Sequence, residues 1–103
     1  MNILEPQKKS IEYILSTQRD AQQGNGSKLL HRGQQIKEKG GFKLHQYGDN
    51  NLVSYVAGSN GESYRVAFLA NGTRQCNCAF EADCKHLVAV GLYLEEFIAE
   101  TEQ

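Results

Sequence analysis

The stretch CNCAFEADCKH, from Cys76 to His86, holds all three cysteines of the chain and one of its three histidines. Its spacing is Cys76-x-Cys78-x5-Cys84-x-His86. Side chains two positions apart on an extended segment point to the same side, so the sulfurs of Cys76 and Cys78 should lie together. The residues AFEAD are enough to turn the chain back toward that pair. The stretch therefore predicts that four side chains with ligating atoms converge.

The residue types of this cluster indicate a metal ion. Three cysteines and one histidine are the ligand set of a closed, tetrahedral zinc site. A helix that begins at Cys84 would lower the pKa of its thiol, which favours the thiolate that a metal requires. We therefore expect Zn²⁺ as the cofactor, with Cys76, Cys78, Cys84 and His86 as its ligands. Iron is a second metal compatible with these ligands.

The same residues allow other interpretations. They include buried apolar cysteines beside a chance histidine, and a Cys76–Cys78 disulfide, which the short loop disfavours. A catalytic cysteine–histidine pair would need an accessible thiolate and a base. An open catalytic zinc site would use three protein ligands and a water, with Glu81 as the base. We favour the closed structural site and expect no enzymatic activity.

Composition predicts one modest core. The chain has 103 residues, of which 40% are hydrophobic and 22% charged, and these values indicate neither disorder nor a membrane span. Its first residues, MNILEPQKKS, lack the pattern of a secretory signal, so we expect a cytoplasmic protein, or a nuclear one in a eukaryote. In such a reducing compartment, clustered cysteines are typically metal ligands rather than disulfides.

Two helices are expected before the cluster. Ile11, Ile14 and Leu15 recur at helical spacing after Pro6, which predicts a helix over residues 6–21. We favour packing of its apolar face on the chain's own sheet over docking in the groove of another protein. The segment QQGNGS, residues 22–27, reads as a flexible linker. It divides the chain into residues 1–27 and a domain of residues 28–103, which opens with a helix over KLLHRGQQIKEKGG.

The apolar pattern then changes to a period of two. Alternation in FKLHQY, LVSYVAG, ESYRVAFLA and TRQCNC, separated by GDNN, SNG and NG turns, predicts three or four antiparallel strands. From His86 onward Leu87, Val90, Leu94 and Phe97 mark one face of a closing helix with an acidic opposite side. The expected fold class is α+β, with a small antiparallel sheet, a zinc knuckle and flanking N- and C-terminal helices.

The cysteine and histidine motif and the segments before it resemble a known family. C-x-C…C-x-H followed by an apolar helix, with the run CKHLVAV, resembles the SWIM zinc finger. The likeness extends upstream through Arg32-Gly33, Gly40-Gly41 and VAGSNGESYRV and covers residues 28–94. It implies a small sheet leading into a zinc knuckle that binds DNA or protein rather than catalysing a reaction. Ala79 stands where the family commonly has proline. No ATPase, transposase or recombination domain accompanies the match, so the resemblance implies that such activity comes from a partner.

Charge distribution suggests where a partner would bind. The net charge is −1, but residues 28–94 carry eight Lys and Arg against five Asp and Glu, whereas four glutamates follow from Glu95. A mildly basic face of this kind suits a phosphate backbone, although a solvated surface would have the same composition. The candidates for nucleic-acid contact are Arg32, Lys43, Arg65, Arg74 and Lys85, with Lys37 and Lys39 beside them.

Aromatic residues supply a further candidate surface. Tyr47, Tyr55 and Tyr64 could stack on single-stranded nucleic acid beside Arg65, or serve as half-buried sheet residues. His31 and His45 are expected at the surface, far from the cysteines. We expect a nucleic-acid partner, DNA in the first place, and a protein partner, but neither a membrane nor a small-molecule substrate. The alternative is an adaptor or regulatory subunit of a larger ATPase, recombination or transposition machine, docked through either terminal helix.

Overall fold

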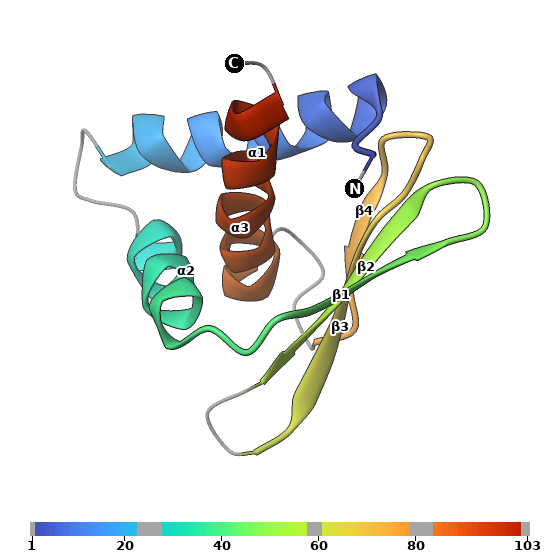
Figure 1. Ribbon diagram of the computed structural model, residues 1–103. Coiled ribbons are helices and arrows are strands. Elements are labelled where there is room, and N and C mark those ends of the chain that lie inside the picture. The colour runs from blue at the N-terminus through green and yellow to red at the C-terminus, as the bar shows by residue number, and fades with distance from the viewer. Residues whose placement is uncertain (1, 23–27, 58–60, 79–83, 102–103) are drawn as a thin grey trace.

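The structure is a computed structural model that describes residues 2–22, 28–57, 61–78 and 84–101. Three helices lie beside one four-stranded antiparallel sheet with strand order β1-β2-β3-β4 (Figure 1). This arrangement confirms the expected α+β class and its terminal helices. Along the chain the elements are α1 (Glu5–Gln22), α2 (Lys28–Lys39), β1 (Lys43–Tyr47), β2 (Asn51–Ala57), β3 (Ser63–Phe68), β4 (Arg74–Cys76) and α3 (Lys85–Thr101).

Helix α1 is anchored by its first turn. The Gln7 side chain is fully buried, and its Oε1 accepts a hydrogen bond of 2.8 Å from the Leu4 N–H, as an N-terminal cap does. Its Nε2 donates to the carbonyl oxygens of Phe68, at 2.9 Å, and of Asn50, at 2.6 Å. These bonds tie the start of the helix to the end of β3 and to the turn before β2.

The apolar side of α1 belongs to the core of the chain. Ile11, Ile14 and Leu15 are buried in the same cluster as the apolar residues of α3 and the sheet. Packing within the chain is therefore confirmed, although the helix lies mainly on α3 rather than on the sheet. The two helices are in contact at Gly91 of α3, where a Cβ would lie 3.6 Å from Leu15 Cδ2, an ordinary van der Waals distance.

Helices α2 and α3 approach each other even more closely. A Cβ on Gly33 would lie 2.5 Å from Val88 Cγ1, so only glycine permits this contact. Helix α2 ends at the expected glycine: the Gly40 N–H donates to the Lys37 carbonyl at 3.0 Å, and Gly40 takes a φ of 71°. Of the linker expected at residues 22–27, Gln22 is the last residue of α1 and residues 23–27 lie outside the described residues. Of the SNG turn expected at residues 59–61, residues 59 and 60 also lie outside them.

The sheet has two different faces. Strand register places Leu52, Val56, Val66 and Phe68 on one face, and all four belong to the core cluster beneath the helices. The alternate positions point to the opposite face, which lies away from the helices in Figure 1. Among the helices that the structure describes, none has the length and apolar character needed to cross a membrane.

Candidate metal centre

The first two cysteines lie at the end of β4 and just beyond it. Cys76 pairs with Val66 at the end of the β3–β4 ladder. The next residue, Asn77, continues the pairing: its N–H donates to the Arg65 carbonyl at 3.2 Å, and its Oδ1 accepts from the Arg65 N–H at 2.9 Å. These two bonds hold the residue between Cys76 and Cys78, so both neighbouring sulfurs are fixed relative to β3.

Helix α3 presents the other two side chains. Cys84 occupies the N-cap position, since its carbonyl accepts the first helical bond, from the Val88 N–H at 3.1 Å. The Leu87 N–H lowers the pKa of the Cys84 thiol, as expected for a side chain at the N-cap position. His86 follows in the first turn, and the two residues are 1% and 4% exposed. The helix start therefore aims two buried ligands at β4.

The four side chains converge as the spacing predicts. Their ligand atoms all lie within 4.8 Å of one another. His86 turns its Nδ1 toward the sulfurs, at 3.8 Å from Cys76 Sγ and 3.7 Å from Cys84 Sγ. Tetrahedral bonds of about 2.3 Å to sulfur and about 2.0 Å to nitrogen would separate the ligand atoms by about 3.6 to 3.8 Å. The cluster can thus hold a metal ion at its centre.

Without a metal, the thiols of the cluster titrate very differently. The hydrogen bond from the Cys76 thiol lowers the pKa of Cys84 to about 5, while burial opposes this shift and the Leu87 N–H assists it. The same bond, together with burial, raises the pKa of Cys76 far above its usual range. All three cysteines are free, which rules out the Cys76–Cys78 disulfide. The structure therefore offers an incoming cation one anionic sulfur at the helix start.

Tyr64 supports the histidine from outside the cluster. Its ring stacks on the imidazole of His86 with centroids 4.3 Å apart and planes 25° from parallel. Its hydroxyl donates a 3.0 Å hydrogen bond to Glu62, and this bond raises the pKa of Tyr64. Groups that orient a ligating histidine strengthen a metal site. Sequence reasoning placed Tyr64 with the other tyrosines, because only the strand register reveals that it faces His86.

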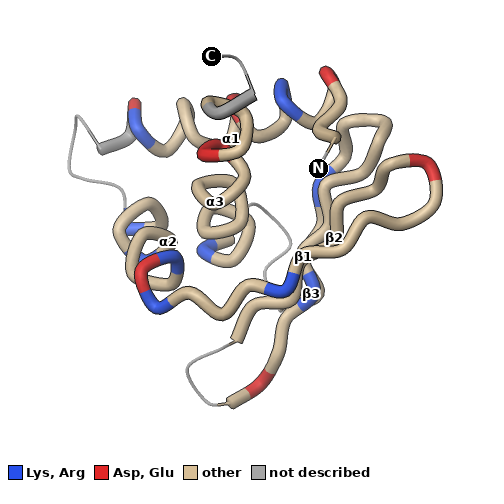
Figure 2. Tube along the Cα trace, viewed as in Figure 1, with Lys and Arg blue, Asp and Glu red and all other residues tan. Residues whose placement is uncertain are grey.

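A cavity opens beside the cluster, between α2, the end of the sheet and the start of α3. Its volume is about 370 Å³, and Tyr64 and His86 form part of its wall. Three cationic side chains line it, and none of the described lining residues is acidic. Figure 2 shows these basic positions on α2 and at the first turn of α3. The described residues that line it are Arg32, Gln35, Ile36, Lys39, Gly40, Ala57, Tyr64, Lys85 and His86.

The five basic residues expected at a nucleic-acid interface do not form one surface. Arg32 and Lys85 line the cavity together. Lys43 and Arg65 flank Tyr55 on the opposite face of the sheet. Arg74 is directed to α1, where its Nη1 donates to Ser10 Oγ at 3.1 Å and its guanidinium lies 5.3 Å from the Tyr13 ring centroid.

The tyrosines and histidines also separate by face. Tyr47 and Tyr55 share the outer face of the sheet, whereas Tyr64 lies on the inner face. His31 and His45 are exposed, as expected. His45 has two aromatic neighbours on the outer face, Tyr47 and Tyr55, which its sequence position alone did not indicate.

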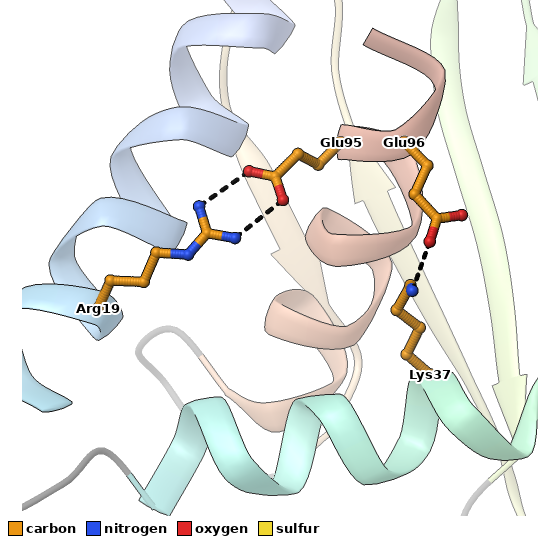
Figure 3. A network of polar contacts seen from close by, with 4 residues as sticks. All are labelled: Arg19, Lys37, Glu95 and Glu96. Atoms are coloured by element: carbon orange, nitrogen blue, oxygen red, sulfur yellow. Dashed lines mark hydrogen bonds and ion pairs between the residues drawn. The ribbon is translucent and has the colours of Figure 1, made fainter. Parts of the chain in front are cut away.

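Two acidic residues near the end of α3 form ion pairs with the other helices (Figure 3). Nη1 and Nη2 of Arg19 in α1 donate to the Glu95 carboxylate, at 2.9 and 2.8 Å. Lys37 of α2 pairs with Glu96 at 2.5 Å. Of the basic residues of α2, Lys37 is therefore paired, whereas Arg32 and Lys39 have no acidic partner among the described residues.

Comparisons of the chain with protein families, with curated proteins and with solved structures found no match.

Proposed function

We propose that Cys76, Cys78, Cys84 and His86 hold one structural Zn²⁺ ion and that the domain so formed binds nucleic acid. The convergence of the four ligand atoms within 4.8 Å supports the zinc assignment. The ion would join the end of the sheet to the start of α3, with four protein ligands and no position left for a substrate. The resemblance to SWIM zinc fingers supports the same assignment.

Metal analysis tests the zinc assignment. The purified chain is expected to contain one zinc per chain, and Co²⁺ in its place should give the absorption of a tetrahedral thiolate site. His86→Ala should lose this absorption, whereas His45→Ala, which changes an exposed histidine outside the cluster, should keep it. A chain that refolds without binding either metal, or a Cys78→Ser variant with full thermal stability after chelation, would refute the proposal.

The cationic cavity supports the nucleic-acid assignment. Arg32, Lys39 and Lys85 gather around one opening, and no described acidic residue pairs with them. Uncompensated positive charge beside a concave surface attracts phosphate. The tetrahedral centre, with three thiolates around a divalent ion, carries one negative charge, so Lys85 would offset it and Arg32 and Lys39 would remain for the ligand.

Salt dependence tests the cavity directly. Binding to a short DNA duplex should weaken steeply with salt, and the logarithmic slope should fall by about 0.9 for each phosphate contact removed. The double variant Arg32→Ala/Lys39→Ala should lower that slope by the amount that corresponds to about two phosphate contacts. Lys37→Ala is the matched control on the same helix, because Lys37 is already paired with Glu96. Equal slopes for the control and the double variant would contradict phosphate binding at the cavity.

The adaptor alternative finds less support. An adaptor would need a free apolar face on α1 or a free acidic end on α3 to which a partner protein could bind. The apolar face of α1 is buried in the core, and Glu95 and Glu96 are paired with Arg19 and Lys37. These residues are therefore already used within the chain, and nucleic acid is the partner that the unpaired charges of the cavity favour.

A further inference from the structure

The outer face of the sheet is a separate surface, distant from the helices and from the metal centre. Its buried floor consists of Val53 and Ala67, which pair across β2 and β3 and stand outside the core cluster. The strand register shows which other residues of the four strands lie on this face. They are Lys43, His45, Tyr47, Asn51, Tyr55, Ala57, Ser63, Arg65 and Gln75.

Three rings form a continuous group over this floor. His45 lies between the two tyrosines, with its ring centroid 5.8 Å from that of Tyr47 and 6.0 Å from that of Tyr55. Tyr47 is 49% exposed, although tyrosines in strands usually cover a core. Lys43 pairs with Tyr55, and Tyr47 lies four residues beyond Lys43 on β1, so its Cα is about 13 Å from that of Lys43 along the strand. The rings therefore present a row rather than a single contact.

The charge of this face has one sign. Lys43 and Arg65 are the cross-strand partners of Tyr55, one on each side of its ring. Both are exposed, and neither has an acidic partner within the described part of the chain. None of the described residues on this face is acidic. A row of rings between unpaired cations complements a ligand that alternates flat rings with negative charges.

We infer that the outer sheet face, through His45, Tyr47 and Tyr55 with Lys43 and Arg65, binds single-stranded nucleic acid by stacking its bases. The bases of a duplex are stacked on each other and unavailable to side-chain rings, whereas unpaired bases stack on aromatic platforms about two or three at a time. The inference rests on the proposed function and adds the form of nucleic acid and a second surface that recognises it.

The test compares oligonucleotides that differ only in their bases. Fluorescence anisotropy of the zinc-bound full chain would use a labelled single strand of about 12 nucleotides, a length within known site sizes, together with its duplex and an abasic strand of equal length. We expect the single strand to bind about tenfold more tightly than the abasic strand. Equal affinity for both strands would overturn the inference, since only phosphates would then be recognised.

Variants locate the stacking surface. Tyr55→Ala should weaken single-strand binding about tenfold, and Tyr55→Phe should restore it because the ring is retained. Tyr47→Ala serves as a second variant, since this exposed side chain can be removed without disturbing the core. Tyr13→Ala, which removes a ring 62% exposed on α1, is the matched control and should bind as the parent does.

The outcomes separate this inference from the proposed function. If the Tyr47 and Tyr55 alanine variants bind single strands as the parent does while the Arg32/Lys39 double variant binds poorly, stacking is refuted and nucleic-acid binding stands. If the parent binds neither single strands nor duplex, both proposals fail. A loss with the tyrosine variants that is absent from the Tyr13 control supports the outer face.

Discussion

Cys84 has two roles that different substitutions can separate. It caps α3 through its carbonyl and sulfur, and it supplies a ligand atom of the cluster. Serine retains the capping role and loses the thiolate, whereas alanine loses both. In the presence of a chelator, Cys84→Ala should therefore be about 1 kcal/mol less stable than Cys84→Ser in urea unfolding.

Cys78 provides the comparison for this prediction. It lies beyond β4 and outside the helix, so its serine and alanine variants should unfold alike in chelator. If the two Cys84 variants are also equally stable, the capping role of the sulfur is wrong.

Substitution of Gly33 tests how closely α2 and α3 approach each other. A methyl group there would meet Val88 Cγ1 at 2.5 Å and Val88 Cβ at 3.0 Å, so the helices must separate. Although alanine favours a helix by about 1 kcal/mol over glycine, overpacking costs about 1 to 3 kcal/mol, so Gly33→Ala should be destabilising or at best neutral. Thermal unfolding of the zinc-bound chain measures the change.

Gly91 is the matched control for Gly33. It is also a helical glycine, but a methyl group there would meet Leu15 Cδ2 at 3.6 Å, an ordinary contact. Gly91→Ala should therefore be tolerated and gain helix propensity. A Gly33→Ala variant more stable than Gly91→Ala would contradict the close approach of α2 and α3.

One buried amide, the side chain of Gln7, connects the first turn of α1 to the end of β3 and to the turn before β2. Gln7→Ala would leave the carbonyls of Phe68 and Asn50 without the donor they have now. Unsatisfied buried groups cost about 1 to 3 kcal/mol, so unfolding should require correspondingly less urea. Gln46→Ala is the control, because the Gln46 Nε2 donates to the Asn2 carbonyl in an exposed position. Similar losses for both variants would show that burial does not set the cost.

The helices and strands followed closely from the periodicity of the sequence. The helix expected over residues 6–21 is α1 at Glu5–Gln22, and the strand expected in FKLHQY is β1 at Lys43–Tyr47. These elements depend on neighbours close in sequence, where apolar spacing and turn residues carry the information. Expected strand ends were less accurate: β4 stops at Cys76, and Asn77 continues the pairing through its side chain.

The core joins all three helices, so removal of the first should affect the entire domain. A chain of residues 28–103 would lose Ile11, Ile14 and Leu15 from the core cluster. Each such side chain contributes about 1.5 to 3 kcal/mol, and their sum approaches the total stability of a small domain. We expect this fragment to lack a cooperative thermal transition even with zinc. A fragment that unfolds like the full chain would instead support a domain boundary at residue 28.

The register of the strands determines which side chains share each face of the sheet. A shift of one residue in register would exchange the two faces of a strand, and such shifts are not readable from alternation alone. The observed register sends Tyr64 inward to His86 and Tyr55 outward between Lys43 and Arg65. The three tyrosines are thus divided between the Cys/His cluster and the open face, and Tyr55 and Tyr64 are half-buried, as expected of sheet residues.

The sequence by itself determined which four side chains converge, because Cys76, Cys78, Cys84 and His86 are close along the chain and their spacing limits where they can point. It also determined the alternation of helix and strand. Only the tertiary structure brought Arg32 of α2 beside Lys85 of α3, and His45 beside Tyr55 across two strands. Such pairs join residues distant in sequence, and their proximity depends on helix packing and strand register, which no local pattern encodes.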